Sequence, residues 1–321
     1  MLVEYSRFRH YISRGQAMIA PVFFSLRPKQ WIKNLILFAA LMFSEKGLLF
    51  ELPAWLYAFA GFLIFCGLSG SVYLLNDIAD VEKDRLHPQK AKRPIAAGEL
   101  SLTEGKAALI IILLVCLTAA YNLSQLFFSM ALAYFMLNLA YSFKLKNMVI
   151  LDVMCIATGF VLRATAGVGA LKALEPTIYI SHWLILSTMM LAMFLGLAKR
   201  RQEIATYQEE AVMHRKILAQ YSLSFIDQMT SILAAMAIVT YSFYTVSSDT
   251  IAKFGSDKLV YTVPMVLYGI LRYLYLIHIQ DKGENPSEVV MNDRPLQINL
   301  VIWAVAVVII IHFSKSGWFN F

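Results

Sequence analysis

Long apolar runs set the strongest limit on what this chain can fold into. Residues 54–75 contain no charged side chain, and similar runs recur along the sequence. A helix needs about 20 apolar residues to cross the hydrocarbon core of a bilayer. Hydrophobic residues make up 59% of the 321 residues and charged residues only 15%, which excludes an ordinary soluble domain. The sequence therefore predicts a protein embedded in the lipid bilayer.

The runs predict an all-α, polytopic bundle of about nine transmembrane helices. The alternation of period two that is typical of a membrane-spanning barrel is absent. Residues 1–30 are predicted to form a basic N-terminal arm, and residues 31–321 a single transmembrane domain. The expected spans are 31–43, 54–75, 107–121, 125–141, 150–170, 178–198, 226–246, 259–279 and 296–313.

Lysine and arginine are distributed unevenly between the two predicted membrane faces. The N-terminal segment and the loops after the even-numbered spans carry 21 of the 28, and the opposite face carries five. The positive-inside rule then predicts a multi-pass protein of the inner (cytoplasmic) membrane, with its N-terminus in the cytoplasm and its C-terminus outside. The net charge of +7 does not indicate nucleic acid binding, because the basic residues lie between spans.

One polar stretch, residues 76–98, carries more chemistry than any other segment. It reads NDIADVEKDRLHPQKAKRPIAAG and begins where the second predicted span ends. If that helix continues, Asp77, Asp80 and Asp84 share one side of it, and so do Asn76, Asp80 and Asp84. Carboxylates this close repel each other, but they suit a hard divalent cation that prefers oxygen ligands and bridges to phosphates. Mg²⁺ is the predicted cofactor, with the active site on the cytoplasmic side.

Cationic residues follow the acidic ones, on a stretch that is interrupted by Pro88 and Pro94 and ends at Gly98. They are Arg85, Lys90, Lys92 and Arg93. Cationic donors beside a metal favour a diphosphate ligand. A charged, solvated loop after a span is the alternative interpretation of the same residues.

The pattern Asn76-Asp77-x-x-Asp80-x-x-x-Asp84 resembles the first aspartate-rich motif of the UbiA superfamily of intramembrane prenyltransferases, at each fixed position. A narrower similarity is to the decaprenyl-phosphate phosphoribosyltransferase branch of that superfamily. It is carried by Arg27, Pro28, Gln30, Trp31, Lys33, Asn34, Tyr141, Ser142, Leu145, Lys146, Gly159, Phe160, Leu162, Arg163 and Gly167.

The chain departs from the superfamily pattern at the sixth predicted span. UbiA-type enzymes generally carry a second aspartate-rich motif near the end of that span. Residues 178–198 contain neither aspartate nor glutamate, and Lys199, Arg200 and Glu203 stand where the motif would be. One acidic cluster with several cationic ones favours a soluble diphosphate together with an anionic lipid phosphate.

The branch resemblance implies that 5-phosphoribose passes from phosphoribosyl pyrophosphate to a polyprenyl phosphate, with release of pyrophosphate. It also implies that Asn76, Asp77, Asp80 and Asp84 hold Mg²⁺, with Asp80 and Asp84 catalytic. Phosphate contacts would then come from Lys33, Asn34, Arg93, Lys144, Lys146, Lys199 and Arg200. An aromatic prenyltransferase that uses a prenyl diphosphate, and a membrane transporter, stay open as alternatives.

Some of these cationic residues also have a structural interpretation. Lys144 and Lys146 fit a positive-inside anchor, and Lys199 and Glu203 stand at i and i+4, where they can form a surface pair. Arg163 lies well inside the fifth predicted span. A charge there is costly unless it faces a cavity or a partner, so Arg163 is a candidate site residue, and a structural ion pair is an equal alternative.

Overall fold

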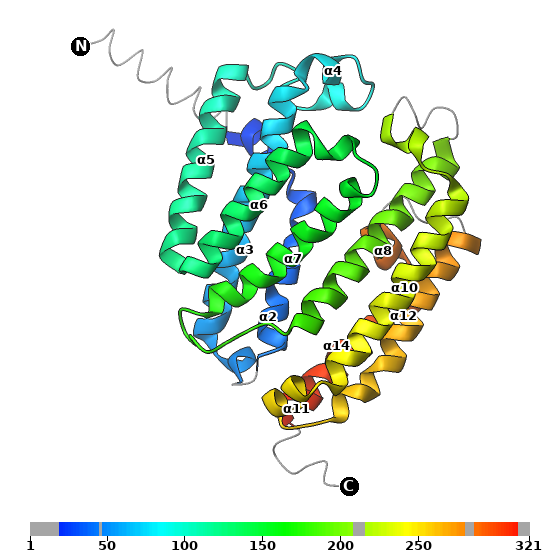
Figure 1. Cartoon of the computed structure of the whole chain (residues 1–321). Coiled ribbons are helices and arrows are strands. Elements are labelled where there is room, and N and C mark those ends of the chain that lie inside the picture. Colours follow the sequence, from blue (N-terminus) through cyan, green and yellow to red (C-terminus); the bar gives the residue numbers. More distant parts are fainter. Residues whose placement is uncertain (1–18, 45–46, 208–215, 280–285, 314–321) are drawn as a thin grey trace.

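The computed structural model describes residues 19–44, 47–207, 216–279 and 286–313, and regular structure in these ranges is helical throughout (Figure 1). Eight segments within them are long and apolar enough to cross a membrane. The predicted all-α, polytopic bundle is therefore confirmed. The eight main helices are α3 (Leu52–Ala79), α5 (Leu102–Leu123), α6 (Gln125–Phe143), α7 (Leu151–Leu171), α8 (His182–Tyr207), α10 (Leu223–Val246), α12 (Val263–Ile279) and α14 (Arg294–Phe313).

The segment expected to form the first span is helical but is not a regular α-helix. It consists of a 3₁₀-helix, η1 (Pro28–Phe38), and one turn of α-helix, α2 (Ala39–Met42). At about 2.0 Å per 3₁₀ residue and 1.5 Å per α residue, the two cover about 28 Å. They run beside α3 and α7 from one end of the bundle to the other (Figure 1). The described part of the chain thus has eight candidate spans where the sequence predicted about nine, and the first predicted span, 31–43, is not among the eight.

A close approach between backbones holds η1 against α7. A Cβ placed on Gly167 of α7 would lie 2.2 Å from the carbonyl oxygen of Leu37, so only glycine fits there. Leu37 itself is fully buried among side chains of α3, α5, α6 and α7. A 3₁₀-helix of this length is uncommon, and here its packing against α7 compensates for its poorer hydrogen-bond geometry.

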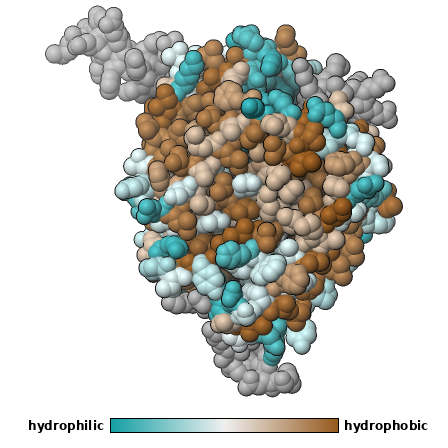
Figure 2. Space-filling view, viewed as in Figure 1, coloured by the Kyte–Doolittle hydropathy of each residue, from teal (hydrophilic) through white to brown (hydrophobic). Residues whose placement is uncertain are grey.

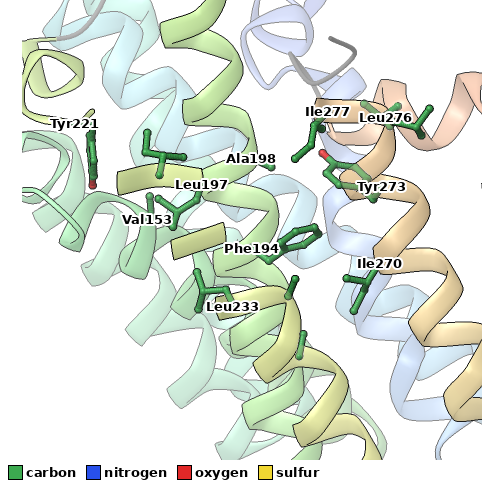
Figure 3. Close-up of a cluster of buried hydrophobic side chains, with 14 of the residues drawn as sticks. Val153, Phe194, Leu197, Ala198, Tyr221, Leu233, Ile270, Tyr273, Leu276 and Ile277 are labelled. Carbon is green, nitrogen blue, oxygen red and sulfur yellow. The ribbon is translucent and has the colours of Figure 1, made fainter. Parts of the chain in front are cut away.

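A second apolar core joins α7 and α8 to the C-terminal half of the bundle. Phe194 and Leu197 of α8 lie with Leu233 of α10 and with Ile270 and Tyr273 of α12 (Figure 3). The rings of Phe194 and Tyr273 meet edge to face, with centroids 5.4 Å apart. This core fixes the direction of α8, whose end carries part of the candidate site.

The outer surface suits a lipid environment. Ile110, Ile111, Leu114 and Val115 of α5 are each more than half exposed. In Figure 2 hydrophilic residues gather toward the two ends of the visible face, and the surface between them is mostly hydrophobic. One end carries α4 (Val81–Arg85), the connection between α6 and α7 and the C-terminal end of α8 (Figure 1). The opposite end carries α11 (Ser248–Phe254).

Candidate active site

The aspartate-rich motif lies where α3 gives way to α4. The α-helix ends at Ala79, and Asp80 lies between the two helices with φ −104° and ψ 13°. Backbone hydrogen bonds from Asp80 to Asn76 (2.9 Å) and from Asp84 to Asp80 (2.8 Å) carry the helical course through this break. The predicted stacking of Asn76, Asp80 and Asp84 along one helical course is therefore present, with a local change of backbone angle at Asp80.

Arg93 brings two carboxylates of the motif together. Its Nη1 lies 3.1 Å from Oδ1 of Asp77 and 2.6 Å from Oδ2 of Asp84. Asp77 and Asp84 are almost fully buried, and Asp77 also accepts a hydrogen bond from Arg27. Two buried carboxylates would repel each other without a cation between them, and Arg93 and Arg27 supply that counter-charge.

The loop that carries Arg93 is fixed by its own packing. Ile95 and Leu100 are buried with Leu74, which precedes the motif, and with Val81, which lies within it. Gly98 has a φ of 81°, a left-handed conformation that glycine adopts without strain. The loop therefore returns Arg93 to the carboxylates through apolar contacts of its neighbours.

The predicted metal ligands suit Mg²⁺ by the type of their donor atoms, but their side chains are not arranged as a metal site. Asn76, Asp77, Asp80 and Asp84 offer the oxygen donors that Mg²⁺ prefers. No group of three or more His, Cys, Asp and Glu side chains is arranged to hold a metal in the described ranges. Asp77 and Asp84 meet at Arg93, and the partly exposed Asp80 lies 3.8 Å from Lys83.

Lys33 and Asn34 are neighbours on η1 with different surroundings. Asn34 is fully buried: its amide donates to Ser69 Oγ (3.2 Å) and accepts from Nε of Arg163 (2.8 Å). Lys33 is partly exposed, and the charges acting on it come from Lys199, Arg163 and Arg27. The structure thus gathers four of the chain's cations from η1, α7, α8 and the residue before η1.

Arg200 is buried in ion pairs. Its Nε lies 3.0 Å from Oδ2 of Asp152, and its Nη1 lies 2.7 Å from Oε2 of Glu203. The neighbouring Lys199 lies 3.9 Å from Glu203, which is the i, i+4 pair that the sequence suggested. The predicted contact of Arg200 with a phosphate stays a prediction, and its guanidinium already has two carboxylate partners.

Lys144 and Lys146 lie in the short connection from α6 to α7, where Leu145–Asn147 forms a 3₁₀ turn, η4. Lys144 is exposed and Lys146 is partly exposed. The connection ends at Ile150, whose φ of 68° is unusual for a β-branched residue. The backbone N–H of Ile150 donates to the hydroxyl of Tyr221 (2.6 Å), which holds the turn in place.

Tyr221 and Asp152 were absent from the predicted site, and they connect its parts. The hydroxyl of Tyr221 donates to Oδ1 of Asp152 (2.8 Å), the carboxylate that also pairs with Arg200. One network therefore links the connection after α6 to the end of α8. Tyr221 is 69 residues from Asp152 in sequence, so no local pattern could have identified the pair.

The structure also has an apolar cavity of about 300 Å³. It lies between η1 and α2 on one side and α7, α8, α10, α12 and α14 on the other. Its walls are mainly aliphatic and aromatic, and they include Ile36, Met42, Val168, Leu191 and Trp303.

Comparison with known proteins agrees with this architecture. Residues 34–300 match the family model of the UbiA prenyltransferase family. The decaprenyl-phosphate phosphoribosyltransferase of Mycolicibacterium smegmatis is 31% identical over 303 residues, which covers 90% of this chain and 92% of that protein. The enzyme of the same name from Corynebacterium glutamicum is 30% identical over 291 residues, with 90% and 86% covered.

Among solved structures, a UbiA homologue from Archaeoglobus fulgidus bound to GPP and Mg²⁺ has a TM-score of 0.67. The match covers 91% of this chain and 99% of the homologue's chain at 19% sequence identity, so the likeness concerns the fold. The same homologue bound to Cd²⁺ has a TM-score of 0.64 at 17% identity. The family match and the relatives together show that this multi-pass membrane protein is a transferase and belongs to the UbiA prenyltransferase family.

Proposed function

We propose that this protein transfers 5-phosphoribose from phosphoribosyl pyrophosphate to a polyprenyl phosphate and releases pyrophosphate. The observation that carries the proposal is the division of charge between α3 and α8. Buried Asp77 lies in the last turn of α3 and buried Asp84 follows in α4, whereas the C-terminal part of α8 carries Lys199. The names of the relatives at 30% and 31% identity support the same reaction.

The acidic end of α3 would receive the soluble donor. Asn76, Asp77, Asp80 and Asp84 would hold Mg²⁺, which when bound neutralises charge on the departing pyrophosphate. Arg93 would exchange its contacts with Asp77 and Asp84 for oxygens of the diphosphate. The separation of Asp77 from Asp84 is set by α3 and α4, so both carboxylates are already turned to one place before the donor arrives.

Cationic residues opposite the motif would hold the lipid phosphate. Lys33 and Lys199 supply positive charge from η1 and α8, and Lys144 and Lys146 add it from the connection after α6. A phosphate monoester is already ionised near neutral pH, so its oxygen can attack C1 of the ribose without a general base. The new bond joins that oxygen to C1, and the C1–O bond to pyrophosphate breaks, with the electron pair leaving on pyrophosphate.

The apolar cavity would receive part of the polyprenyl chain. Its lining includes Ile36 of η1, three residues from Lys33, so a lipid whose phosphate is near Lys33 can extend into it. The proposal places the charged end of the bundle in the cytoplasm, within reach of a soluble sugar phosphate, in an inner membrane with the C-terminus outside.

A transfer assay tests this function. The purified chain is incubated with Mg²⁺, a polyprenyl phosphate and radiolabelled phosphoribosyl pyrophosphate, and label is counted in the organic phase. We expect transfer by the wild type and a loss of about 100-fold or more in Asp84→Asn, because a carboxylate at the metal and diphosphate is removed. Asp249→Asn, an exposed aspartate on α11 at the opposite end, is the matched control and should keep full activity.

The same assay has outcomes that reject the proposal. If no label moves while the protein consumes a prenyl diphosphate with an aromatic acceptor, the donor is a prenyl diphosphate and the ribose donor is wrong. If Asp84→Asn transfers label as fast as Asp249→Asn, the motif does not bind the donor.

A further inference from the structure

Arg163 is a buried cation whose hydrogen-bond partners are all neutral. It lies in the middle of α7 and is 6% exposed. Its guanidinium donates to Oδ1 of Asn34 (2.8 Å), to the hydroxyl of Tyr134 (2.6 Å) and to the carbonyl of Gly159 (3.1 Å). The ring of Tyr134 also lies under it, with the centroid 4.5 Å from Cζ. Among the described residues, Arg163 forms no salt bridge.

Such a charge is expensive to bury. Dipoles and an aromatic face reduce the cost of removing a guanidinium from water, but an anion compensates it more fully. Charged side chains inside membrane helices generally face a partner or a water-filled path. The cost of burying the charge of Arg163 is therefore compensated in full only when an anion comes close to it as the protein works.

Lys33 is a second cation in the surroundings of Arg163. Lys33 experiences the positive charges of Arg163, Lys199 and Arg27. Lys199 and Arg27 each pair with a carboxylate, but within the described ranges Lys33 and Arg163 do not. The described side chains thus leave two positive charges in one region without a carboxylate. A phosphate group, with up to two negative charges, complements this excess.

Arg163 also retains capacity to bind. A guanidinium has five N–H groups, and the three hydrogen bonds above use one on each nitrogen. Asn34 accepts from Nε and so fixes the plane of the group, while Asn34 itself is held by Ser69. The remaining N–H groups belong to Nη1 and Nη2, in a planar fork suited to phosphate oxygens.

We propose that Arg163 is a phosphate-binding residue, which together with Lys33 compensates the charge of a substrate phosphate drawn into the bundle, and that Asn34 orients it. The ligand class is a phosphate monoester or diphosphate. The residue assignment rests on the contacts of Arg163, and only the identity of the ligand rests on the proposed function. The phosphate can come from the lipid or from the soluble substrate.

Binding measurements separate these sources without requiring turnover. The full chain in detergent is titrated with a polyprenyl monophosphate, and separately with inorganic pyrophosphate and Mg²⁺, following tryptophan fluorescence. We expect Arg163→Gln to lose about thirtyfold or more in affinity for one of the two ligands. Arg163→Lys, which keeps the charge, should lose much less. Arg272→Gln is the matched control, since Arg272 is a membrane arginine already paired with Asp293 at 2.8 Å.

Asn34→Asp tests the same proposal while Arg163 stays in place. The substitution keeps the shape of the side chain and places a carboxylate beside Nε of Arg163. If Arg163 serves a ligand, this internal anion should lower affinity for the same ligand that Arg163→Gln affects. Unchanged affinities for both ligands in Asn34→Asp would contradict a binding role for Arg163. This variant decides the matter even where Arg163→Gln does not fold.

Each outcome has one meaning. A loss confined to the polyprenyl monophosphate assigns Arg163 to the lipid headgroup, and a loss confined to pyrophosphate assigns it to the soluble substrate. Unchanged affinities for both ligands in folded Arg163→Gln or in Asn34→Asp overturn the proposal. If binding depends on Arg163 while the wild type transfers no phosphoribose, the anion site stands and the proposed reaction fails by itself.

Discussion

The bundle contains two buried arginines that are neutralised in opposite ways. Arg200, near the end of α8, is 2% exposed and pairs with Asp152 and Glu203. Arg163, in the middle of α7, is 6% exposed and is surrounded by neutral groups. Burial is therefore nearly the same, and the difference lies in the counter-charge.

This difference separates a structural role from a binding role. An arginine with two carboxylates has its charge satisfied by the protein, and a ligand phosphate would have to compete with them. An arginine with neutral partners has its geometry fixed while its charge is still available. In this protein the counter-charge, and not the degree of burial, distinguishes the two, and the predictions below test that distinction.

The largest expected effect on stability comes from Arg200→Met. Asp152 is fully buried, so this change leaves a buried carboxylate without its cation. We expect the free energy of unfolding to fall by about 3–5 kcal/mol, measured by chemical denaturation in detergent. Arg163→Gln should cost less, because no carboxylate is left behind.

The double variant Arg200→Met with Asp152→Asn is the control for that prediction. Removing both charges should restore a large part of the lost stability, because the uncompensated carboxylate is gone. If Arg163→Gln destabilises the protein as much as Arg200→Met, the proposed distinction between the two arginines is wrong.

A smaller effect is expected where η1 meets α7. In Gly167→Ala the new methyl group would lie 2.2 Å from the carbonyl oxygen of Leu37, so one backbone must move. We expect a loss of about 1–3 kcal/mol in unfolding free energy and weaker anion binding, because η1 carries Lys33 and Asn34. Thermal unfolding and the two ligand titrations measure both effects.

Gly159→Ala on the same helix is the matched control. Its new methyl group would meet nothing closer than 3.5 Å, which is an ordinary contact, and alanine favours a helix over glycine. It should leave stability unchanged or slightly raised. An equal loss of unfolding free energy in the two variants would mean that the close approach of η1 to α7 does not stabilise the protein.

Much of this arrangement could be predicted from local sequence. The apolar runs predicted the helices, because each must span the bilayer, and the helical period predicted that Asn76, Asp80 and Asp84 follow one course. The 3₁₀ form of η1 was not predictable. It depends on packing against Gly167, a residue more than 100 positions away in the chain.

The partners of the charged side chains were less predictable than the positions of the charged residues. The sequence identified Arg163 as a candidate but left an ion pair equally open, because its partners lie 29 and 129 residues away, at Tyr134 and Asn34. Arg93 was expected to contact a phosphate, and its bridge between Asp77 and Asp84 depends on how the intervening loop folds back. Sequence periodicity has no information on such contacts.

An effect of similar size to that of Gly167→Ala concerns Tyr221, which completes the Arg200 site. Tyr221→Phe removes the donor to Asp152 and the acceptor for the N–H of Ile150, so we expect a loss of about 1–3 kcal/mol at pH 8. Burial, reinforced by the hydrogen bond to Asp152, raises the pKa of Tyr221 to about 12. Unfolding free energies of both proteins from pH 8 to 12 measure the effect.

The direction of the pH dependence follows from the raised pKa. The folded protein holds the Tyr221 proton more tightly than the unfolded chain, where a tyrosine titrates near pH 10. The stability gained from this proton is complete below about pH 10 and is lost as pH rises toward 12. The advantage of the wild type over Tyr221→Phe should therefore shrink across that interval. A constant difference would show that Tyr221 is not the protonated partner of Asp152, and the counter-charge of Arg200 would then need another explanation.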